Sequence, residues 1–364
     1  MKSGSAFVFL LYAVFSVVCS GCGGKNAPAV AEETGKTIGV FIPGVISGSP
    51  VYEMLAVGVQ AAADGRAKVT LIEGGYNQAE WENKVTAMAA SASYDLIVSA
   101  NPSLPSIVSV VSEKFPSQYF LLLDGELEGN PMVYSSRYNQ REQGYMAGYM
   151  AALITGALFS ESSLSKESEL SEKSELSLGS ELSPNGAKRI GLIAAQEYPV
   201  MNNIILPGYL EGAQAVDPGY EVDFRIVGNW YDAARAEELA ADMIRGGVKA
   251  ILTISGGANE GVVQAAHSAG AKVLWFDNNG YNVRPDTVVG CAVLAQDKAA
   301  YTQVRRWLNG ELPFGKAEIL GVAEGYVDFI QDDPDYILRI PEDIRKKQAA
   351  MIEKIRSGEL VLDS

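Results

Sequence analysis

Apolar runs of strand length alternate with amphipathic segments of helical length along most of this 364-residue chain. The expected strands are residues 38–42, 69–73, 95–99, 119–123, 132–135, 190–194, 221–227, 250–254, 272–276 and 287–290. The expected helices are residues 52–64, 80–91, 106–115, 143–154, 233–245, 261–269 and 296–309. Continuously apolar strands that alternate with helices indicate parallel sheets covered by helices on both faces. The series occurs twice, so the pattern predicts two doubly wound, three-layer α/β lobes.

The lobes are expected to be joined by crossover segments, so that each lobe contains two separate parts of the chain. We expect residues 37–136 and 287–313 in the N-lobe, and residues 137–286 and 314–336 in the C-lobe. Residues 337–364 are expected to form a C-terminal helical tail. Crossovers near residues 137–143, 285–290 and 313–317 would let the lobes close over a ligand by a hinge motion.

Residues 160–187 interrupt the pattern with a degenerate Ser-Glu-Leu-Ser repeat. The segment has few apolar residues and no aromatic ones, so it cannot bury enough surface to offset its ordering entropy. A charged amphipathic helix is the alternative, but leucines that recur every six residues match no helical period. We therefore expect a disordered surface insertion outside the site.

The N-terminus has the pattern of an export signal. Lys2 precedes an apolar run at residues 6–18, and Cys22 follows Ser20-Gly21 as in a bacterial lipobox. The run is too short to span a membrane stably. We expect a signal peptide at residues 1–21, a lipid, including palmitate, on Cys22, a tether at residues 22–36, and a lipid-anchored protein facing the periplasm or the cell exterior. Plain secretion and a redox Cys-x-x-Cys pair are the alternatives.

Composition excludes several kinds of chemistry. The chain has 29 Lys and Arg against 44 Asp and Glu, a net charge of −15, which disfavours nucleic acid as a partner. Cys291 is the only cysteine beyond Cys22, so no intrachain disulfide framework is expected, and His267 is the single histidine. No metal-ligand cluster or catalytic carboxylate pair stands out. We expect a monomeric binding protein without metal or cofactor; an exported hydrolase and a sensor subunit are the alternatives from other classes.

Ligands of open parallel sheets bind beyond the carboxyl ends of the strands. Those positions are rich here in Asn, Gln, Tyr and Trp. The candidate ligand-binding residues are Tyr52, Tyr76, Asn101, Asp124, Tyr138, Gln140, Tyr198, Asn202, Trp230, Asn259, Asp277 and Asn279. Amide side chains offer donors and acceptors, and aromatic rings offer flat stacking faces. The set fits a small, neutral, planar, polyhydroxylated ligand better than a phosphate, which prefers basic residues and glycine-rich amides.

Several motifs together resemble the basic membrane protein family. They are Asp124-Gly125, Gln143-Gly-Tyr-Met-Ala-Gly148, Gly208-Tyr-Leu-Glu-Gly212, Gly228-Asn-Trp-Tyr-Asp232 and Gly256-Gly-Ala-Asn-Glu-Gly261. The resemblance runs from about residue 37 to 329, apart from the insertion. It implies a type I periplasmic-binding-protein-like fold, a lipoprotein that serves an ABC permease, and often a purine nucleoside as ligand.

The departures from that family concern its nucleoside contacts. Pro43 stands where nucleoside receptors of the family carry Asp, and Val51-Tyr52-Glu53 replaces Ser-Phe-Asn. Leu294 aligns with their ribose-binding Lys, whereas the sugar-side Asp is kept as Asp277.

Other strings are similar to the spirochaetal riboflavin-uptake lipoproteins of the same family. They include Tyr76-Asn-Gln-Ala-Glu-Trp81, Arg137-Tyr-Asn-Gln140, Tyr198-Pro-Val-Met201 and Trp275-Phe-Asp-Asn-Asn-Gly-Tyr281. The implied ligand is riboflavin, with a purine nucleoside as the alternative.

In that interpretation Tyr52, Tyr138 and Trp230 stack on the isoalloxazine ring, with Tyr76 and Tyr198 as weaker candidates. The ring's polar edge or the ribityl hydroxyls bond to Asn101, Asp124, Gln140, Asn202 and Asn259. Asp277 and Asn279 take the far end of the chain.

Overall fold

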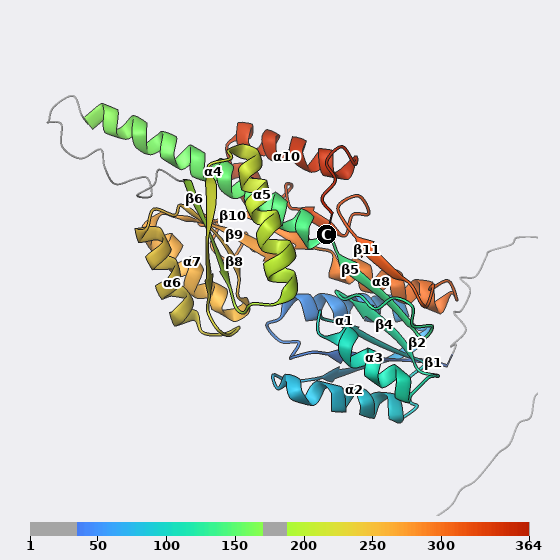
Figure 1. The fold of residues 1–364 in the computed structure, drawn as a ribbon. Helices are drawn as coiled ribbons and strands as arrows, with labels where there is room; N and C mark the ends of the chain where they lie inside the picture. Colours follow the sequence, from blue (N-terminus) through green and yellow to red (C-terminus); the bar gives the residue numbers. More distant parts are fainter. Residues whose placement is uncertain (1–34, 170–187, 364) are drawn as a thin grey trace, which may run out of the picture. The chain divides into compact units, whose positions relative to one another are not determined.

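A computed structural model describes residues 35–169 and 188–363, which form two α/β lobes (Figure 1). The first lobe is built on a sheet of six parallel strands. In spatial order they are β11 (Ala317–Leu320), β5 (Val133–Tyr138), β4 (Tyr119–Leu123), β3 (Leu96–Ala100), β1 (Lys36–Ile42) and β2 (Ala67–Glu73).

The sheet of the second lobe repeats this topology. In spatial order its strands are β12 (Val327–Phe329), β10 (Val288–Leu294), β9 (Lys272–Asp277), β8 (Ala250–Ile254), β6 (Lys188–Ala194) and β7 (Tyr220–Ile226). Five strands run parallel, and β12 pairs antiparallel with β10. Each strand thus has a counterpart in the other lobe, so that β4 corresponds to β9 and β2 to β7.

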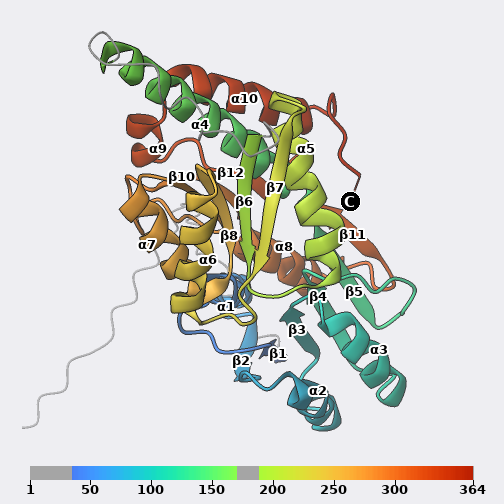
Figure 2. The ribbon, with the colours of Figure 1, turned by 60° about the vertical axis from the view of Figure 1, so that its left-hand side comes forward.

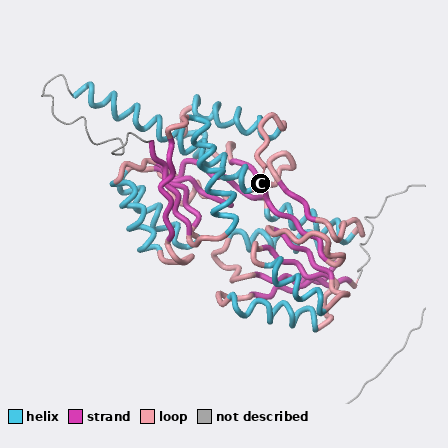
Figure 3. The backbone as a smooth tube through the Cα atoms, in the orientation of Figure 1, coloured by secondary structure: helices cyan, strands magenta, loops and turns pink. Residues whose placement is uncertain are grey.

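Helices cover both faces of the first sheet, as its continuously apolar strands predict. Neighbouring strand residues point to opposite faces. Val40 therefore packs in the cluster with α1 (Pro50–Ala63) and α8 (Gln296–Leu308), and Phe41 packs in the cluster with α2 (Trp81–Ala90) and α3 (Leu104–Lys114). Figure 3 shows the cyan helices flanking the magenta strands. The predicted three-layer architecture is confirmed.

The second lobe contains α5 (Leu206–Val216), α6 (Ala233–Arg245), α7 (Asn259–Ala269) and most of the described part of α4 (Gln140–Glu169). Helices α4 and α5 lie side by side (Figure 2) and approach each other through glycines. A Cβ atom at Gly148 would lie 1.9 Å from the Tyr209 carbonyl oxygen, and one at Gly212 would lie 2.0 Å from the Tyr145 carbonyl oxygen. The glycines of these two motifs therefore allow the close packing of α4 on α5.

Three crossovers connect the lobes, at β5–α4, β10–α8 and β11–β12. They are bonded to one another: the Asn139 N–H donates to the Leu320 carbonyl at 2.9 Å, and the Ala295 N–H donates to the Tyr326 carbonyl at 2.9 Å. The Tyr138 hydroxyl donates to Gln296 Oε1 at 2.5 Å, which links the first crossover to the second.

Two of the expected crossovers differ from those observed. Strand β10 pairs with β9 in the second sheet, although residues 287–313 were assigned to the N-lobe. Strand β11 pairs with β5 in the first sheet, although residues 314–336 were assigned to the C-lobe. The second crossover therefore follows β10 instead of preceding it, because β10 pairs with β9 of the second lobe. The third crossover likewise follows β11, which pairs with β5 of the first lobe.

Helix α4 continues to Glu169 and so enters the segment that we expected to be disordered from residue 160. Residues 170–187 of that insertion, the signal peptide, Cys22 and the tether up to residue 34 lie outside the described residues. The C-terminal tail is helical, as predicted, with α9 (Pro334–Arg339) and α10 (Glu342–Arg356). Helix α10 packs on α4, where the buried Gln348 amide donates to the Met146 carbonyl at 3.1 Å.

Candidate functional site

Two aspartates occupy equivalent places in the two lobes. Asp124 directly follows β4, and Asp277 ends the corresponding strand β9. Both adopt a left-handed backbone conformation, with φ of 58° and 71°, which is uncommon for residues other than glycine and is often found at functional sites. Their carboxyl groups are close enough for the charge of Asp277 to raise the pKa of Asp124. The carboxyl ends of the two sheets therefore contribute one acidic group each to a shared site.

Burial governs the protonation of this pair. It raises the pKa of Asp124 to about 8, and the negative charge of Asp277 adds to the effect. Burial also raises the pKa of Asp277 to about 6, against the effect of a hydrogen bond from Gln143. Among the described residues none donates a hydrogen bond to the Asp124 carboxyl group. Both carboxyl groups of the pair therefore hold a proton to higher pH than an exposed aspartate does.

Three of the predicted tyrosines lie near enough to one or both aspartates for the carboxylate charge to act on their hydroxyl groups. Burial, followed by the charges of Asp277 and Asp124, raises the pKa of Tyr198 far above its usual value. Burial and then the charge of Asp124 likewise raise the pKa of Tyr138, which is 3% exposed. Burial raises the pKa of Tyr52 to about 12. The hydrogen bond from Asn101 opposes this shift, and the charge of Asp124 adds to it. All three hydroxyls therefore remain protonated at physiological pH.

The Tyr52 ring and Asn101 form a fixed pair within the first lobe. The Asn101 amide nitrogen donates to the Tyr52 hydroxyl oxygen at 3.1 Å, while its Oδ1 accepts the Ser103 N–H at 2.9 Å. The ring lies against Gly44, which has φ +149°, and a Cβ atom there would be 3.0 Å from the Tyr52 Cε2 atom. A glycine at position 44 thus permits the observed position of the ring.

Two buried glutamines complete the site, and neither is among the candidates from the sequence. Gln143 Nε2 donates to Asp277 Oδ1 at 3.1 Å and to the Ala292 carbonyl at 3.0 Å, whereas its Oε1 is buried without a partner. Gln296 Oε1 accepts the Tyr138 hydroxyl, and its Nε2 is also buried without a partner. Their position at the start of α4 and α8, directly after crossover strands, is the signal that could have identified them.

The asparagines of the second lobe mainly hold its loops. Asn259 Oδ1 accepts three hydrogen bonds, from Thr253 Oγ1 at 2.6 Å and from the Ser255 N–H and Oγ, both at 2.8 Å. Asn279 is exposed; it donates to Asp333 Oδ2 at 2.9 Å and accepts the Tyr281 N–H at 3.0 Å. These oxygens are engaged within the protein, which leaves less of each side chain available to a ligand.

Four other candidates occupy varied environments. Gln140 is buried at the start of α4. Asn202 lies in a π-helical turn at Met201–Ile205, donates to Glu197 Oε2 at 3.0 Å, and has a buried Oδ1 without a partner. Tyr76 is 81% exposed, and Trp230 is 40% exposed and lies against Gly256. No contact places Tyr76 or Trp230 with the aspartates, although both lie beyond the ends of the equivalent edge strands β2 and β7.

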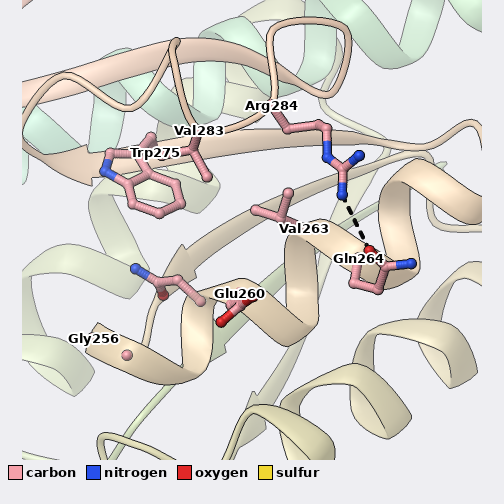
Figure 4. Close-up of a pocket in the computed structure, with 9 residues that line it drawn as sticks. Gly256, Glu260, Val263, Gln264, Trp275, Val283 and Arg284 are labelled. Carbon is pink, nitrogen blue, oxygen red and sulfur yellow. Dashed lines mark hydrogen bonds between the residues drawn. The ribbon is translucent and has the colours of Figure 1, made fainter.

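A separate pocket of about 320 Å³ lies on the second lobe (Figure 4). Trp275, Val263 and Val283 form its apolar wall, and Arg284 donates to Gln264 Oε1 at 3.2 Å on one side. Asn259 is the only candidate ligand-binding residue that lines it, and neither aspartate does. The pocket is therefore distinct from the group around Asp124 and Asp277.

Residues 35–169 and 188–363 contain neither a candidate metal site nor a helix that could span a membrane. Within these ranges no group of three or more His, Cys, Asp and Glu side chains could hold a metal ion. None of the helices there has the length and apolar character needed to cross a bilayer. Cys291 is buried, and burial raises its pKa to about 12, so this thiol remains protonated.

Known proteins support this architecture. A crystal structure of an ABC transporter solute-binding protein from Aeropyrum pernix K1 superimposes with a TM-score of 0.73, covering 90% of this chain and 93% of that chain at 20% identity. At that identity the likeness shows the fold, two lobes of the type I periplasmic-binding class.

Sequence relatives agree with the structural match. The ABC transporter nucleoside-binding protein BmpA of Lactococcus lactis is 24% identical over 49% of this chain and 42% of its own length. A CD4+ T-cell-stimulating antigen of Listeria innocua is 21% identical over 75% of this chain and 71% of its own length. The Bmp family model, described as ABC transporter substrate-binding protein PnrA-like, matches residues 35–360. The chain therefore belongs to the Bmp family of PnrA-like ABC transporter substrate-binding proteins.

Proposed function

We propose that this protein is the receptor of an ABC importer and captures riboflavin between the strand ends of its two lobes. The observation that carries the proposal is the gathering of Tyr52, Tyr138 and Tyr198 around Asp124 and Asp277. An isoalloxazine ring offers flat faces to aromatic side chains, and its uracil-like edge and ribityl hydroxyls offer donors to carboxyl groups. Riboflavin also carries no charge, in keeping with aspartates that have no lysine or arginine partner among the described residues.

Family membership supports the role in transport. A substrate-binding protein of an importer works outside the cytoplasm, and the lipobox at Cys22 would hold it beside its permease. One acyl chain binds a membrane only marginally, so stable anchoring requires the additional chains of a bacterial lipoprotein. The three bonded crossovers would act as the hinge when the lobes close on the ligand.

A purine nucleoside is the second candidate, because the Lactococcus relative is named a nucleoside-binding protein. Leu294 argues against it. This residue ends β10, is 4% exposed and packs in the apolar core of the second lobe, at the position that aligns with the ribose-binding Lys of nucleoside receptors. A leucine there cannot bond to ribose hydroxyls.

Riboflavin fluorescence titrated with the protein distinguishes the two ligands, with guanosine and inosine as competitors. We expect quenching that saturates at one ligand per chain and persists when either nucleoside is added in excess. Tyr198→Ala should weaken the quenching, whereas Tyr301→Ala, a change at a 44% exposed tyrosine on α8, should not. Absence of quenching, together with thermal stabilisation by a nucleoside, would overturn the riboflavin assignment.

A further inference from the structure

We propose that Gln143 is a positioning residue for the ligand: its amide holds the carboxyl group of Asp277 in one orientation and ties it to the crossover strand β10. The inference rests on the proposed function in that it takes Asp277 as a ligand-binding group. It does not depend on whether the ligand is a flavin or a nucleoside. Gln143 occupies the first turn of α4, directly after the crossover from β5.

The Gln143 side chain bridges the ends of two adjacent strands. Its Nε2 donates at 3.1 Å to Oδ1 of Asp277, the last residue of β9, and at 3.0 Å to the Ala292 carbonyl of β10. In the register of the sheet, Asp277 pairs with Val293, the residue after Ala292. One amide therefore links the carboxyl group to the strand that leads into the second crossover.

These partners determine which way the Gln143 amide faces. A backbone carbonyl can only accept a hydrogen bond, so the amide nitrogen must face Ala292. Turning the amide over would place its oxygen against both that carbonyl and the Asp277 carboxyl group. Gln143 is 0% exposed, and its Oε1 has no partner among the described residues. The two bonds of Nε2 therefore give the amide a single favourable orientation.

The arrangement leaves one oxygen of Asp277 for a ligand. Oδ1 accepts the Gln143 amide, whereas no described residue donates a hydrogen bond to Oδ2. Asp277 is partly accessible to solvent, although enough protein surrounds it to raise its pKa. A hydroxyl or N–H group of a ligand can therefore bond to Oδ2 without displacing Gln143.

Gln348 offers a matched control in the same lobe. It is also 0% exposed, its amide donates to the Met146 carbonyl at 3.1 Å, and its Oε1 likewise has no partner among the described residues. It lies on α10 and bonds to neither aspartate. Gln143→Met and Gln348→Met therefore each remove a buried amide that bonds to a backbone carbonyl, and only the first should act on Asp277.

The first test measures the pKa of Asp277 without ligand, by NMR of protein with isotope-labelled aspartate carboxyl groups. The resonance is assigned by its absence in Asp277→Gly, a change that suits the φ of 71°. The bond from Gln143 favours the ionised carboxyl group, so the pKa should rise above its native value of about 6 in Gln143→Met and stay unchanged in Gln348→Met. Gln143→Glu is the second variant if methionine prevents folding, and its carboxylate should also raise this pKa. All these variants keep the other titratable groups near Asp277, which are Asp124, Tyr138 and Tyr198.

The second test measures dissociation constants by calorimetry, with riboflavin and guanosine as probes. Gln143→Met should weaken the probe that binds by about 10-fold or more, as expected for the loss of a hydrogen bond to a charged group. Gln348→Met should change the affinity by less than about twofold. In an Asp277→Gly background Gln143→Met should cause no further loss, because a positioning residue acts only through the group that it positions.

The outcomes separate this inference from the proposed function. If guanosine binds and riboflavin does not, the riboflavin assignment fails, and guanosine still measures the effect of Gln143. If neither probe binds, the proposed function fails, and the pKa of Asp277 alone decides whether Gln143 holds its carboxyl group. An unchanged pKa in the Gln143 variants overturns the inference. A loss of affinity that persists in the Asp277→Gly background also overturns it, since Gln143 would then act on the ligand by another route.

Discussion

Asp124 and Asp277 stand at equivalent positions after equivalent strands of the two lobes, and the charge of one raises the pKa of the other. Both have positive φ, a conformation that persists in non-glycine residues only where the surroundings enforce it. The repeated topology thus brings the same side chain to the site from each lobe.

This pair makes the stability of the protein depend on pH. The folded pKa of Asp124, about 8, lies above the value of about 3.9 expected for an unfolded chain. Between these values the folded state holds a proton that the unfolded state has released, so the free energy of unfolding falls as pH rises from about 4 to 8. The folded pKa of Asp277 is about 6, so this residue also lowers the free energy of unfolding as pH rises from about 4 to 6.

Asp124→Asn should flatten this dependence. We expect urea unfolding at pH 5, 7 and 8.5, without ligand, to show a loss of a few kcal/mol across the range in the native protein and a clearly smaller loss in the variant. An equal slope in both proteins would show that Asp124 ionises normally.

The hydroxyl groups of two site tyrosines should differ in what they contribute. Tyr138 donates to the buried Gln296, whereas no described residue bonds to the Tyr198 hydroxyl. Tyr138→Phe leaves the Gln296 amide without any partner and should lower the free energy of unfolding by about 1–3 kcal/mol. Tyr198→Phe should leave stability unchanged and affect only ligand affinity. Equal losses of stability in the two variants, measured by thermal unfolding, would contradict this assignment.

Helix α4 offers a matched pair of glycine substitutions. Gly148→Ala would place a methyl group 1.9 Å from the Tyr209 carbonyl oxygen, so α4 and α5 must separate, and we expect a loss of about 3 kcal/mol or more. Gly156 lies on the same helix with nothing within 4 Å of an added Cβ, and Gly156→Ala should stabilise the protein by about 0.5–1 kcal/mol. A mild effect at position 148 would show that the helices can move apart.

Trp230 remains a predicted stacking residue. If its ring contacts the ligand, Trp230→Ala should weaken riboflavin binding by about 1–3 kcal/mol. Tyr231→Ala is the control at the neighbouring residue, which is 77% exposed. Unchanged affinity in the Trp230 variant would limit this residue to its packing against Gly256.

The sequence predicts the two lobes well because strand and helix periodicities report directly on burial. It places the crossovers less well, since the apolar strand β10 could complete either sheet, and the short strand β11, with the exposed Ile319, is not among the expected strands. Lobe membership there depends on long-range pairing, which no local pattern encodes.

The sequence likewise predicts some residues of the candidate site and misses others. Asp124 and Asp277 follow from the rule that ligands lie beyond strand ends. Asn259 and Asn279 meet that rule too, but asparagine is also common where a side chain must bond to nearby backbone, as both do here. Gln143 and Gln296 were missed because a polar residue in the first turn of a helix is ordinarily solvated, and only the packing of the crossovers buries these two.

A crystal structure of the protein grown with riboflavin would test most directly whether the strand ends of the two lobes hold this ligand. We expect an isoalloxazine ring against Tyr52 or Tyr198, with ligand hydroxyl or N–H groups bonded to Asp124 and Asp277. Riboflavin bound in the pocket of Figure 4, or elsewhere without contact to either aspartate, would contradict it.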